Sequence, residues 1–543
     1  MGMKGSTTMT HRALVSISAL LFAASVSACG SDFTCDDTNN CSGTGGSGAT
    51  DGGGATSGTG GSGNTSGTSG TGGAAGDGGS CDTTKSPSEE GCLIDSQYGV
   101  FVSPDGDDTS GDGTKDKPFK TLSKALDSAA SGQKRVFACA TAGSYSGAVN
   151  VSSAHDGVSL YGGFDCSTWA YSASTHSVID GGEMSLLKID GATGFDVEDF
   201  DVVASDAAAG SSIAVWINAS TGVTLRRVKA EAGKGAKGAD ATPFTVAAKA
   251  GTQGNKGSDA CSDPSNGGTA VTTNCSPGTS VGGKGGDGGK GGSSAGSGDT
   301  GQTGTAGEPG FGETLAGWSC AVGGTNGGGN AGASGGAGGP GGGGSGAGTL
   351  SSSGFAPADG KAGTAGGAGQ GGGGGGGAKA PAVCTGGPVV PTGASGGSGG
   401  GGGCGGEGGP GGKGGGASIA LVSVNSTITF DSVDLVSKDG GAGGKGADGQ
   451  GGGSGGPGGP GGTKSGTSAK DACSGGIGGE GGAGGPGGGG AGGPSIGLAY
   501  VGTKPSGAPA VTTATTPATG GLDGLGQSTH AGSDGLIENE HAF

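Results

Sequence analysis

The fold is decided by one repeated stretch, which reads Val215-Trp216-Ile217-Asn218, Val223-Thr224-Leu225 and Val228-Lys229-Ala230. An earlier copy reads Leu187-Lys188-Ile189-Asp190, Phe195-Asp196-Val197 and Phe200-Asp201-Val202, with each piece 28 residues before its counterpart. Apolar and polar residues alternate within the pieces, as they do in β-strands. Because one such coil cannot bury its apolar row alone, the repeat predicts the stacked coils of a solenoid.

A third copy of the pattern begins only at Val422 and continues to Leu435, and a shorter start appears at 495–501. Glycine-rich blocks, 233–416 and 438–494, separate these copies. We therefore expect Val215 and Val422 to lie in neighbouring coils of one scaffold. On this interpretation the glycine-rich blocks are insertions that leave from one equivalent corner of successive coils.

Composition limits what the rest of the chain can form. Glycine supplies 150 of the 543 residues, and apolar residues make up only 30%. Such a chain cannot bury a side-chain core along its whole length. The 20 prolines are too few for collagen, and a net charge of −18 gives no basic surface for nucleic acid.

The glycine-rich blocks leave three structures open. In 282–290 and 455–462 glycine occupies about two of every three positions, which suits either disorder or a bundle of extended helices with three residues per turn. These segments resemble glycine-rich antifreeze proteins and mycobacterial glycine-rich repeat proteins. A calcium β-roll is the third structure, because Gly443–Asp448 matches the start of its repeat, but Gln450 stands where that repeat needs a large apolar residue.

The start of the solenoid carries a second pattern. Phe101-Val102-Ser103-Pro104-Asp105-Gly106 leads through Gly113-Thr114 to Pro118-Phe119, and apolar residues then recur at helical spacing to Ala129, with Pro118 in the first turn. This opening resembles that of bacterial right-handed parallel β-helix proteins, including polysaccharide lyases. The resemblance implies an all-β fold, a right-handed parallel β-helix, whose first coil is covered by a short amphipathic helix.

The N-terminus reads as an export signal. A basic start and a short apolar run end in Val26-Ser27-Ala28-Cys29-Gly30. This motif resembles the lipobox of bacterial lipoproteins, which implies that Cys29 is lipidated and that the protein is anchored at the outer membrane or cell surface. We divide the chain as follows: 1–28 signal peptide, 29–97 lipidated Cys29 and flexible tether, 98–232 cap and first coils, 233–416 first insertion, 417–437 coil, 438–494 second insertion, and 495–543 last coil with a C-terminal tail.

Twelve cysteines remain once Cys29 is set aside, and an exported protein keeps disulfides. They are Cys35, Cys41, Cys81, Cys92, Cys139, Cys166, Cys261, Cys275, Cys320, Cys384, Cys404 and Cys473. Spacing makes Cys35–Cys41, Cys81–Cys92 and Cys261–Cys275 plausible local pairs. Zinc binding is disfavoured, since no C-x-x-C motif occurs.

Few residues suggest chemistry. Asp105, Asp107, Asp108 and Asp112 are the candidate calcium ligands, although a solvated polar turn explains them as well and we expect no cofactor. The coil carboxylates are expected to face outward; they are Asp190, Asp196, Glu198, Asp199 and Asp201. Lys188, Lys229, His155 and His176 belong to no catalytic motif, and Trp169, Trp216 and Trp318 could stack on sugars.

The sequence favours a lipid-anchored structural or interaction protein of the cell envelope, whose β-helix displays glycine-rich loops for adhesion or matrix contact. Its partners would then be the membrane, through the anchor, and an extracellular polysaccharide or surface. One alternative is a polysaccharide lyase or hydrolase acting on the β-helix face. A further alternative is an ice- or surface-binding module built from glycine helices.

Overall fold

The computed structural model describes residues 81–182, 184–291, 296–304, 308–314, 317–385, 390–467 and 469–543. One unit, which begins at Gly79, contains all of them. The expected signal peptide, Cys29, the tether as far as residue 80, and the pair Cys35 and Cys41 lie outside these ranges. Among the described residues, no helix has the length and apolar character that crossing a membrane requires.

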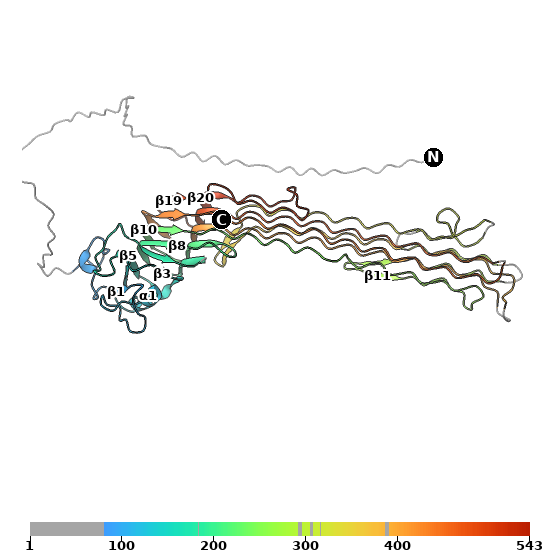
Figure 1. Ribbon diagram of the computed structural model, residues 1–543, viewed down its shortest axis with the longest axis horizontal. Helices are drawn as coiled ribbons and strands as arrows, with labels where there is room; N and C mark the ends of the chain where they lie inside the picture. The colour runs from blue at the N-terminus through green and yellow to red at the C-terminus, as the bar shows by residue number, and fades with distance from the viewer. Residues whose placement is uncertain are drawn as a thin grey trace, which may run out of the picture. The chain divides into compact units, whose positions relative to one another are not determined.

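Two parallel sheets build the body of the protein (Figure 1). The first has six strands in the order β20-β18-β15-β9-β7-β4. From β4 to β20 these strands are Val149–Ser152, Met184–Asp190, Ser212–Asn218, Ser418–Val424, Ser495–Val501 and Ile537–Ala542. All of their pairings are parallel, as stacked coils require.

The second sheet has ten strands. They are β1 Val100–Val102, β2 Arg135–Cys139, β3 Tyr145–Ser146, β5 Ser159–Phe164, β6 Ser177–Asp180, β8 Asp196–Val203, β10 Val223–Glu231, β16 Ile428–Asp431, β17 Asp434–Val436 and β19 Ala510–Thr512. Strands β8 and β10 bend at Asp199 and Arg227, which have φ angles of 61° and 50°. In the next coil Ser432, with φ 58°, separates β16 from β17 at the same corner. Each coil therefore has three faces.

The structure confirms the coil repeat and shows the register of its third copy. Val197 pairs with Leu225 and Ile189 with Ile217, at the predicted spacing. Strand β15 lies beside β9, as expected for neighbouring coils, but Leu421 is the residue opposite Val215. Val215 and Val422 therefore lie in neighbouring coils, as predicted. Both faces of β15 are buried, so alternation alone leaves its register open.

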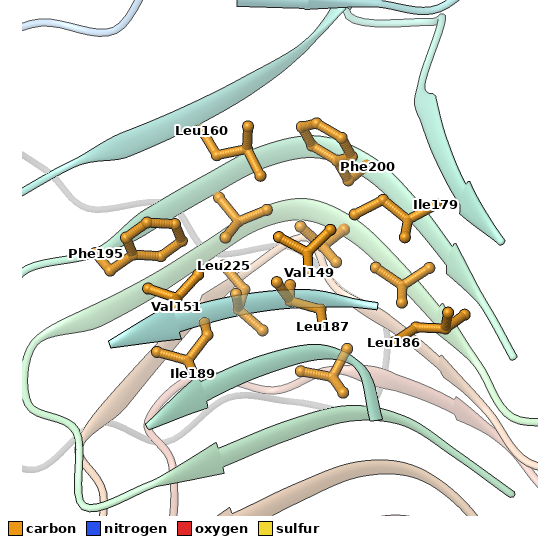
Figure 2. Close-up of a cluster of buried hydrophobic side chains, with 14 of the residues drawn as sticks. Val149, Val151, Leu160, Ile179, Leu186, Leu187, Ile189, Phe195, Phe200 and Leu225 are labelled. Carbon is orange, nitrogen blue, oxygen red and sulfur yellow. The ribbon is translucent and has the colours of Figure 1, made fainter. Parts of the chain in front are cut away.

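Side chains from the two sheets fill the space between them (Figure 2). One inward column is continuous through five coils and consists of Val149, Leu187, Val215, Leu421 and Leu498. The next position in this column is Glu540 of β20, whose carboxylate lies 2.7 Å from the Lys504 ammonium. A charged residue therefore ends the apolar core at the C-terminal coil.

Helix α1, Leu122–Ala130, packs its apolar face against the first coil, as the resemblance implied. Its N-cap is Thr121, whose hydroxyl accepts a hydrogen bond from the N–H of Lys124. Pro118 and Phe119 lie outside the helix, contrary to the prediction. Phe119 instead forms a bridge with Val102 and extends the sheet.

Residues 81–97, which we had assigned to the flexible tether, belong to the folded body. A disulfide joins Cys81 to Cys92, and the short 3-10 helix η1, Gly91–Leu93, buries Leu93 completely. A second short helix, η2, Ser153–His155, follows β4.

The outer face of the first sheet is covered as well. Trp216 and Val422 pack there with Leu350, which belongs to a hairpin of β13, Thr349–Ser351, and β14, Gly354–Ala356. Phe355 of the same hairpin contacts the ring of Phe543. A small hairpin of β11, Thr272–Asn274, and β12, Thr279–Val281, lies within the first glycine-rich block.

The described parts of the glycine-rich blocks are hydrogen bonded to one another and run side by side away from the coils (Figure 1). We call their regular stretches glycine segments; the main ones are 235–260, 329–344, 358–378, 395–416, 441–463 and 472–493. In 441–463 every third N–H donates to 395–416: Gly441 to Gly416, Gly444 to Lys413, and so on to Gly462 and Ser395. This three-residue step is that of the extended glycine helix. Gly443–Asp448 continues the same segment, so the β-roll interpretation is wrong.

The C-terminal region also departs from the predicted division. Residues 518–535 form a third excursion, which joins the bundle through the N–H of Gly521 and the carbonyl of Gly490. The chain then returns to the solenoid as β20. What we expected to be a tail is therefore part of both regions.

Candidate functional site

Three of the four candidate aspartates in the cap loop, Asp107, Asp108 and Asp112, accept hydrogen bonds from the protein's own donors. Asp108 accepts hydrogen bonds from the N–H groups of Lys120 and Thr121 and from the Thr121 hydroxyl. The pKa of Asp107 lies below its ordinary value because the N–H groups of Ser110 and Thr109 bond its carboxylate.

Asp112 is held in the same way, and the Thr114 hydroxyl and N–H lower its pKa. Asp105 instead uses its N–H, which donates to the hydroxyl of Ser103. Within the described ranges, no three histidine, cysteine or acidic side chains are grouped as metal ligands would be. The carboxylates of Asp107, Asp108 and Asp112 therefore stabilise the turns of the cap.

Two of the coil carboxylates are buried, although the sequence predicted that all would face water. Glu198 and Asp199 are 5% and 1% exposed. The reason is a column of charges that stacks from coil to coil, which we call the charge ladder: Glu198, Arg226 and Asp431. Arg226 lies 3.2 Å from Glu198 and 3.0 Å from Asp431.

A second cluster forms at the corner beside the ladder. The Arg227 guanidinium contacts Asp199 at 2.6 Å and Glu198 at 3.1 Å, and the Tyr171 hydroxyl donates to Asp199 at 2.8 Å. Burial raises the pKa of Glu198 while the two arginines oppose that change, and burial together with Asp199 raises the pKa of Tyr171 to about 12.

Every charge in this cluster faces an opposite charge, and none of the five hollows described below reaches it. A carboxylate that serves as acid or base must reach a substrate, and these do not. We interpret the charge ladder and its corner as a device that joins coils.

The other polar candidates are similarly engaged. Lys188 pairs with Asp190 at 3.2 Å and Lys229 with Glu231 at 2.9 Å. His176 contacts Asp201 at 2.7 Å, which raises the pKa of the histidine. The buried imidazole of His155 accepts from the N–H of Ser152.

The three tryptophans are buried, at 4 to 7% exposure, and cannot stack on a sugar. The surface carries open hollows, among them five of about 270 to 470 Å³. The hollow of about 470 Å³ lies at the last coil, where the ion-paired Lys504 and Glu540 line it. Another hollow lies at the cap loop, where Asp105, Asp107 and Asp116 line it.

Five disulfides brace the described residues. Cys81–Cys92 confirms one predicted local pair, and Cys139–Cys166 closes a loop beside the first coils. The predicted pair Cys261–Cys275 was wrong, because Cys261 joins Cys384 and Cys275 joins Cys404. With Cys320–Cys473, the three bridges of the bundle connect residues 123 to 153 positions apart. Local spacing could not reveal these pairs, since they depend on how the glycine segments pack.

Glycine segment 395–416 shows why two of three residues must be glycine. It lies at the centre, hydrogen bonded to 235–260, 358–378, 441–463 and 472–493. A Cβ atom at Gly403 would overlap the carbonyl of Gly453, and one at Gly402 would overlap the carbonyl of Gly369.

Side chains in this segment occur only at the third position of each turn. These positions hold Ser395, Ser398, Gly401, Cys404, Glu407, Pro410, Lys413 and Gly416. At the other two positions of each turn a Cβ atom would point at a neighbouring backbone, so these positions must be glycine. The number of glycines in each triplet therefore indicates how many sides of a segment are covered by neighbouring segments.

Segments at the edge of the bundle obey the same rule with fewer glycines. In 235–260 only Gly251, Gly254 and Gly257 of the distal part face a neighbour, and added Cβ atoms there would overlap carbonyls of 395–416. The intervening positions carry side chains such as the ion pair of Lys256 with Asp259 at 2.8 Å. Three residues per turn place these two side chains on one ridge.

Gln450 is an exception that supports the rule. Gln450 lies on the ridge of 441–463 that faces segment 235–260, where glycine is otherwise needed. Residues 242–247 of that segment leave the bundle, so there is room for a side chain at Gln450. The Gln450 amide fills the gap by accepting from the N–H of Glu407 and donating to the carbonyl of Val246.

Four of the nine exposed large apolar side chains in the described ranges lie near the loops that end the glycine segments. Phe311, Val322, Val383 and Val390 are 45 to 72% exposed. Val322 and Val383 adjoin the disulfide cysteines Cys320 and Cys384. Exposed apolar residues on cross-linked loops are typical of contact surfaces rather than of a folding core.

No protein-family model matches this sequence, and no curated protein matches it. Among solved structures, the chain is similar to Aspergillus niger pectin methylesterase in two deglycosylated forms, at 14% identity over 28% of this chain and 46% of that chain, with a TM-score of 0.17. Escherichia coli YbhC is similar at 14% identity over 26% and 44%, with a TM-score of 0.18. The chain thus spans less than half the length of these proteins. From its own strand pairing, the protein is an all-β parallel β-helix with glycine-rich excursions.

Proposed function

We propose that this is a structural and adhesive protein of the cell envelope, anchored through Cys29. The β-helix serves as the base, and the bundle of glycine segments serves as an arm that holds its end loops away from the base. The observation that carries the proposal is the backbone hydrogen bonding of the bundle, which keeps it ordered with almost no side-chain core. Flexible loops could not hold a contact surface at a fixed position.

Two further observations support an interaction role over catalysis. The buried coil carboxylates are neutralised by Arg226 and Arg227. The exposed Val322 and Val383 lie on disulfide-linked loops, and a rigid contact surface loses less conformational entropy on binding than a flexible one. This arrangement supports our proposal of contact with a matrix polysaccharide or a neighbouring surface.

Binding of the purified chain from Ser31 onward to intact cells and to acidic polysaccharides tests the proposal. We expect saturable retention without release of shortened products, with or without calcium. Retention should fall when Val322→Asp and Val383→Asp are combined, and it should persist in the control Val246→Asp, which changes an equally exposed valine on the loop at 242–247. Polysaccharide cleavage would favour the enzyme instead, and equal retention by both variants would exclude these loops.

The anchor has its own test. A fatty-acid probe should label the full-length chain in cells and should not label the Cys29→Ala variant. Equal labelling of the two would place the lipid elsewhere and remove the anchor from the proposal.

A further inference from the structure

A hollow of about 270 Å³ lies where glycine segment 235–260 ends, on the side of the bundle away from the coils (Figure 1). We call it the end hollow. The N–H of Cys261 donates to the carbonyl of Thr392 at this point, and the disulfide of Cys261 with Cys384 joins the turn to the loop that carries Val383. The end hollow therefore lies in the region that we propose as the contact surface.

Buried hydroxyl groups build the wall of the end hollow. Ser265 and Thr392 line it and are 4% and 5% exposed. The Ser265 hydroxyl donates to the carbonyl of Gly393 at 2.6 Å, and the Thr392 hydroxyl donates to the carbonyl of Ser262 at 2.8 Å. The shape of the end hollow is therefore set by the protein's own hydrogen bonds.

Two charged side chains of the end hollow lack an ion pair. Elsewhere in the bundle, opposite charges three residues apart share a ridge and pair there. Lys284, Asp287 and Lys290 occupy one such ridge, but Asp287 pairs with Lys284, at 3.2 Å. Within the described ranges neither Lys290 nor Asp263 forms an ion pair, although both line the end hollow and both are exposed.

These two side chains offer complementary hydrogen-bonding groups. An ammonium group only donates and a carboxylate only accepts, whereas a hydroxyl group does both. A molecule rich in hydroxyl groups can therefore bond Lys290 and Asp263 at the same time. The side-chain amide of Asn266 adds a donor and an acceptor to the same lining, and Pro264 and Val390 add apolar surface for the C–H groups of a sugar ring.

We propose that the end hollow binds one neutral sugar unit of a polysaccharide. This inference rests on the proposed contact role and names the chemical class that the contact recognises. An anionic unit would lie against the carboxylates of Asp263 and Asp287, so the unit in the hollow is neutral even where other units of the same polysaccharide are acidic. The volume lies just below the range of about 300–1,000 Å³ found for pockets that hold drug-sized molecules, which suits a single unit.

Isothermal titration calorimetry of the chain from Ser31 onward tests this proposal. The neutral probes are cellotetraose, maltotetraose and chitotetraose; tetragalacturonate is the anionic probe and diglycine the zwitterionic probe. We expect at least one neutral probe to bind in the millimolar range or tighter, and more tightly than the two charged probes. The combined variant Asp263→Ala and Lys290→Ala should weaken that binding by at least about tenfold. The matched control is Asp448→Ala with Lys445→Ala, an exposed pair of charges on 441–463 that lines none of the five hollows.

Equal binding by the wild type and the Asp263→Ala, Lys290→Ala variant would overturn the proposal, as would a failure of all three neutral probes to bind. Tighter binding of tetragalacturonate or of diglycine would overturn the assignment of a neutral sugar. Thermal midpoints equal to that of the wild type are expected in both variants, since all four replaced side chains are exposed.

The contact role itself is tested separately, by the retention of the Val322→Asp, Val383→Asp variant on cells. Neither valine lines the end hollow. A failure of sugar binding is therefore distinguishable from a failure of the proposed function.

Discussion

The β-helix and the glycine bundle both exclude water from their interiors, but the β-helix buries side chains and the bundle buries backbone. Between the sheets, columns of side chains such as Val215 and Leu421 exclude water, and the backbone is bonded along the strands. In the bundle, the backbone itself is buried, and glycine is needed because neighbouring chains approach too closely for a Cβ atom. A buried N–H or carbonyl without a partner is costly, so the bundle depends on its three-residue register as the β-helix depends on side-chain volume.

The largest difference between the two regions should appear when a cross-link of the bundle is removed. Replacing Cys275 and Cys404 by serine opens a loop that spans 129 residues, and the chain-entropy model assigns such a loop about 4–5 kcal/mol. We expect faster amide exchange in 395–416 and 441–463 of the variant. Exchange in β8 and β10 should be unaffected, and equal acceleration there would show that the two regions unfold as one.

Shortening a core side chain should destabilise the β-helix and leave the glycine bundle unaffected. Leu225 is fully buried between the sheets. Leu225→Ala loses the favourable burial of the removed carbon atoms and leaves a cavity, and together these should lower the free energy of unfolding by about 2–5 kcal/mol. Amide exchange should accelerate in β8, β10 and β16. If only the glycine segments responded, the side-chain core would not be what holds the coils together.

Adding one methyl group should damage the bundle. Gly403→Ala places a Cβ atom against the carbonyl of Gly453, and we expect a loss of about 1–3 kcal/mol from overpacking. The control Gly336→Ala meets no atom and should be neutral or slightly stabilising, since alanine restricts the unfolded chain. Thermal unfolding of the two variants decides the matter, and equal losses would refute the steric rule.

The smallest effect concerns pH and the β-helix face. Because Asp201 raises the pKa of His176 in the folded state, the charged histidine stabilises the fold below its unfolded pKa of about 6.5. This contribution is lost as the pH rises through the folded pKa. We expect His176→Gln to lower the unfolding midpoint at pH 5.5 more than at pH 8.5. A loss that does not change with pH would mean that the imidazole acts through packing alone.

Sequence reasoning located the coils because apolar residues in the 187–230 region repeat at one spacing, and stacking preserves that spacing. It could not fix the register of β15, where both faces are buried. It placed Glu198 and Asp199 outside because it could not see that Arg226 and Arg227 of the next coil would cover them.

The glycine segments were harder to predict than the coils. Their triplets are compatible with disorder, and only the neighbours of each segment explain where glycine is needed. The same limitation hid the long-range disulfides, since Cys275 and Cys404 meet only after the segments between them have packed.

Hydrogen exchange at the centre of the bundle tests the central claim most directly. The N–H groups of Gly400, Gly403 and Gly406 donate to the carbonyls of Gly476, Gly479 and Gly482. If the glycine-rich blocks form a backbone-bonded bundle, these amides should be protected to a degree comparable with those of β10. Exchange at the rate of an unstructured peptide at these three glycines, with β10 still protected, would contradict it.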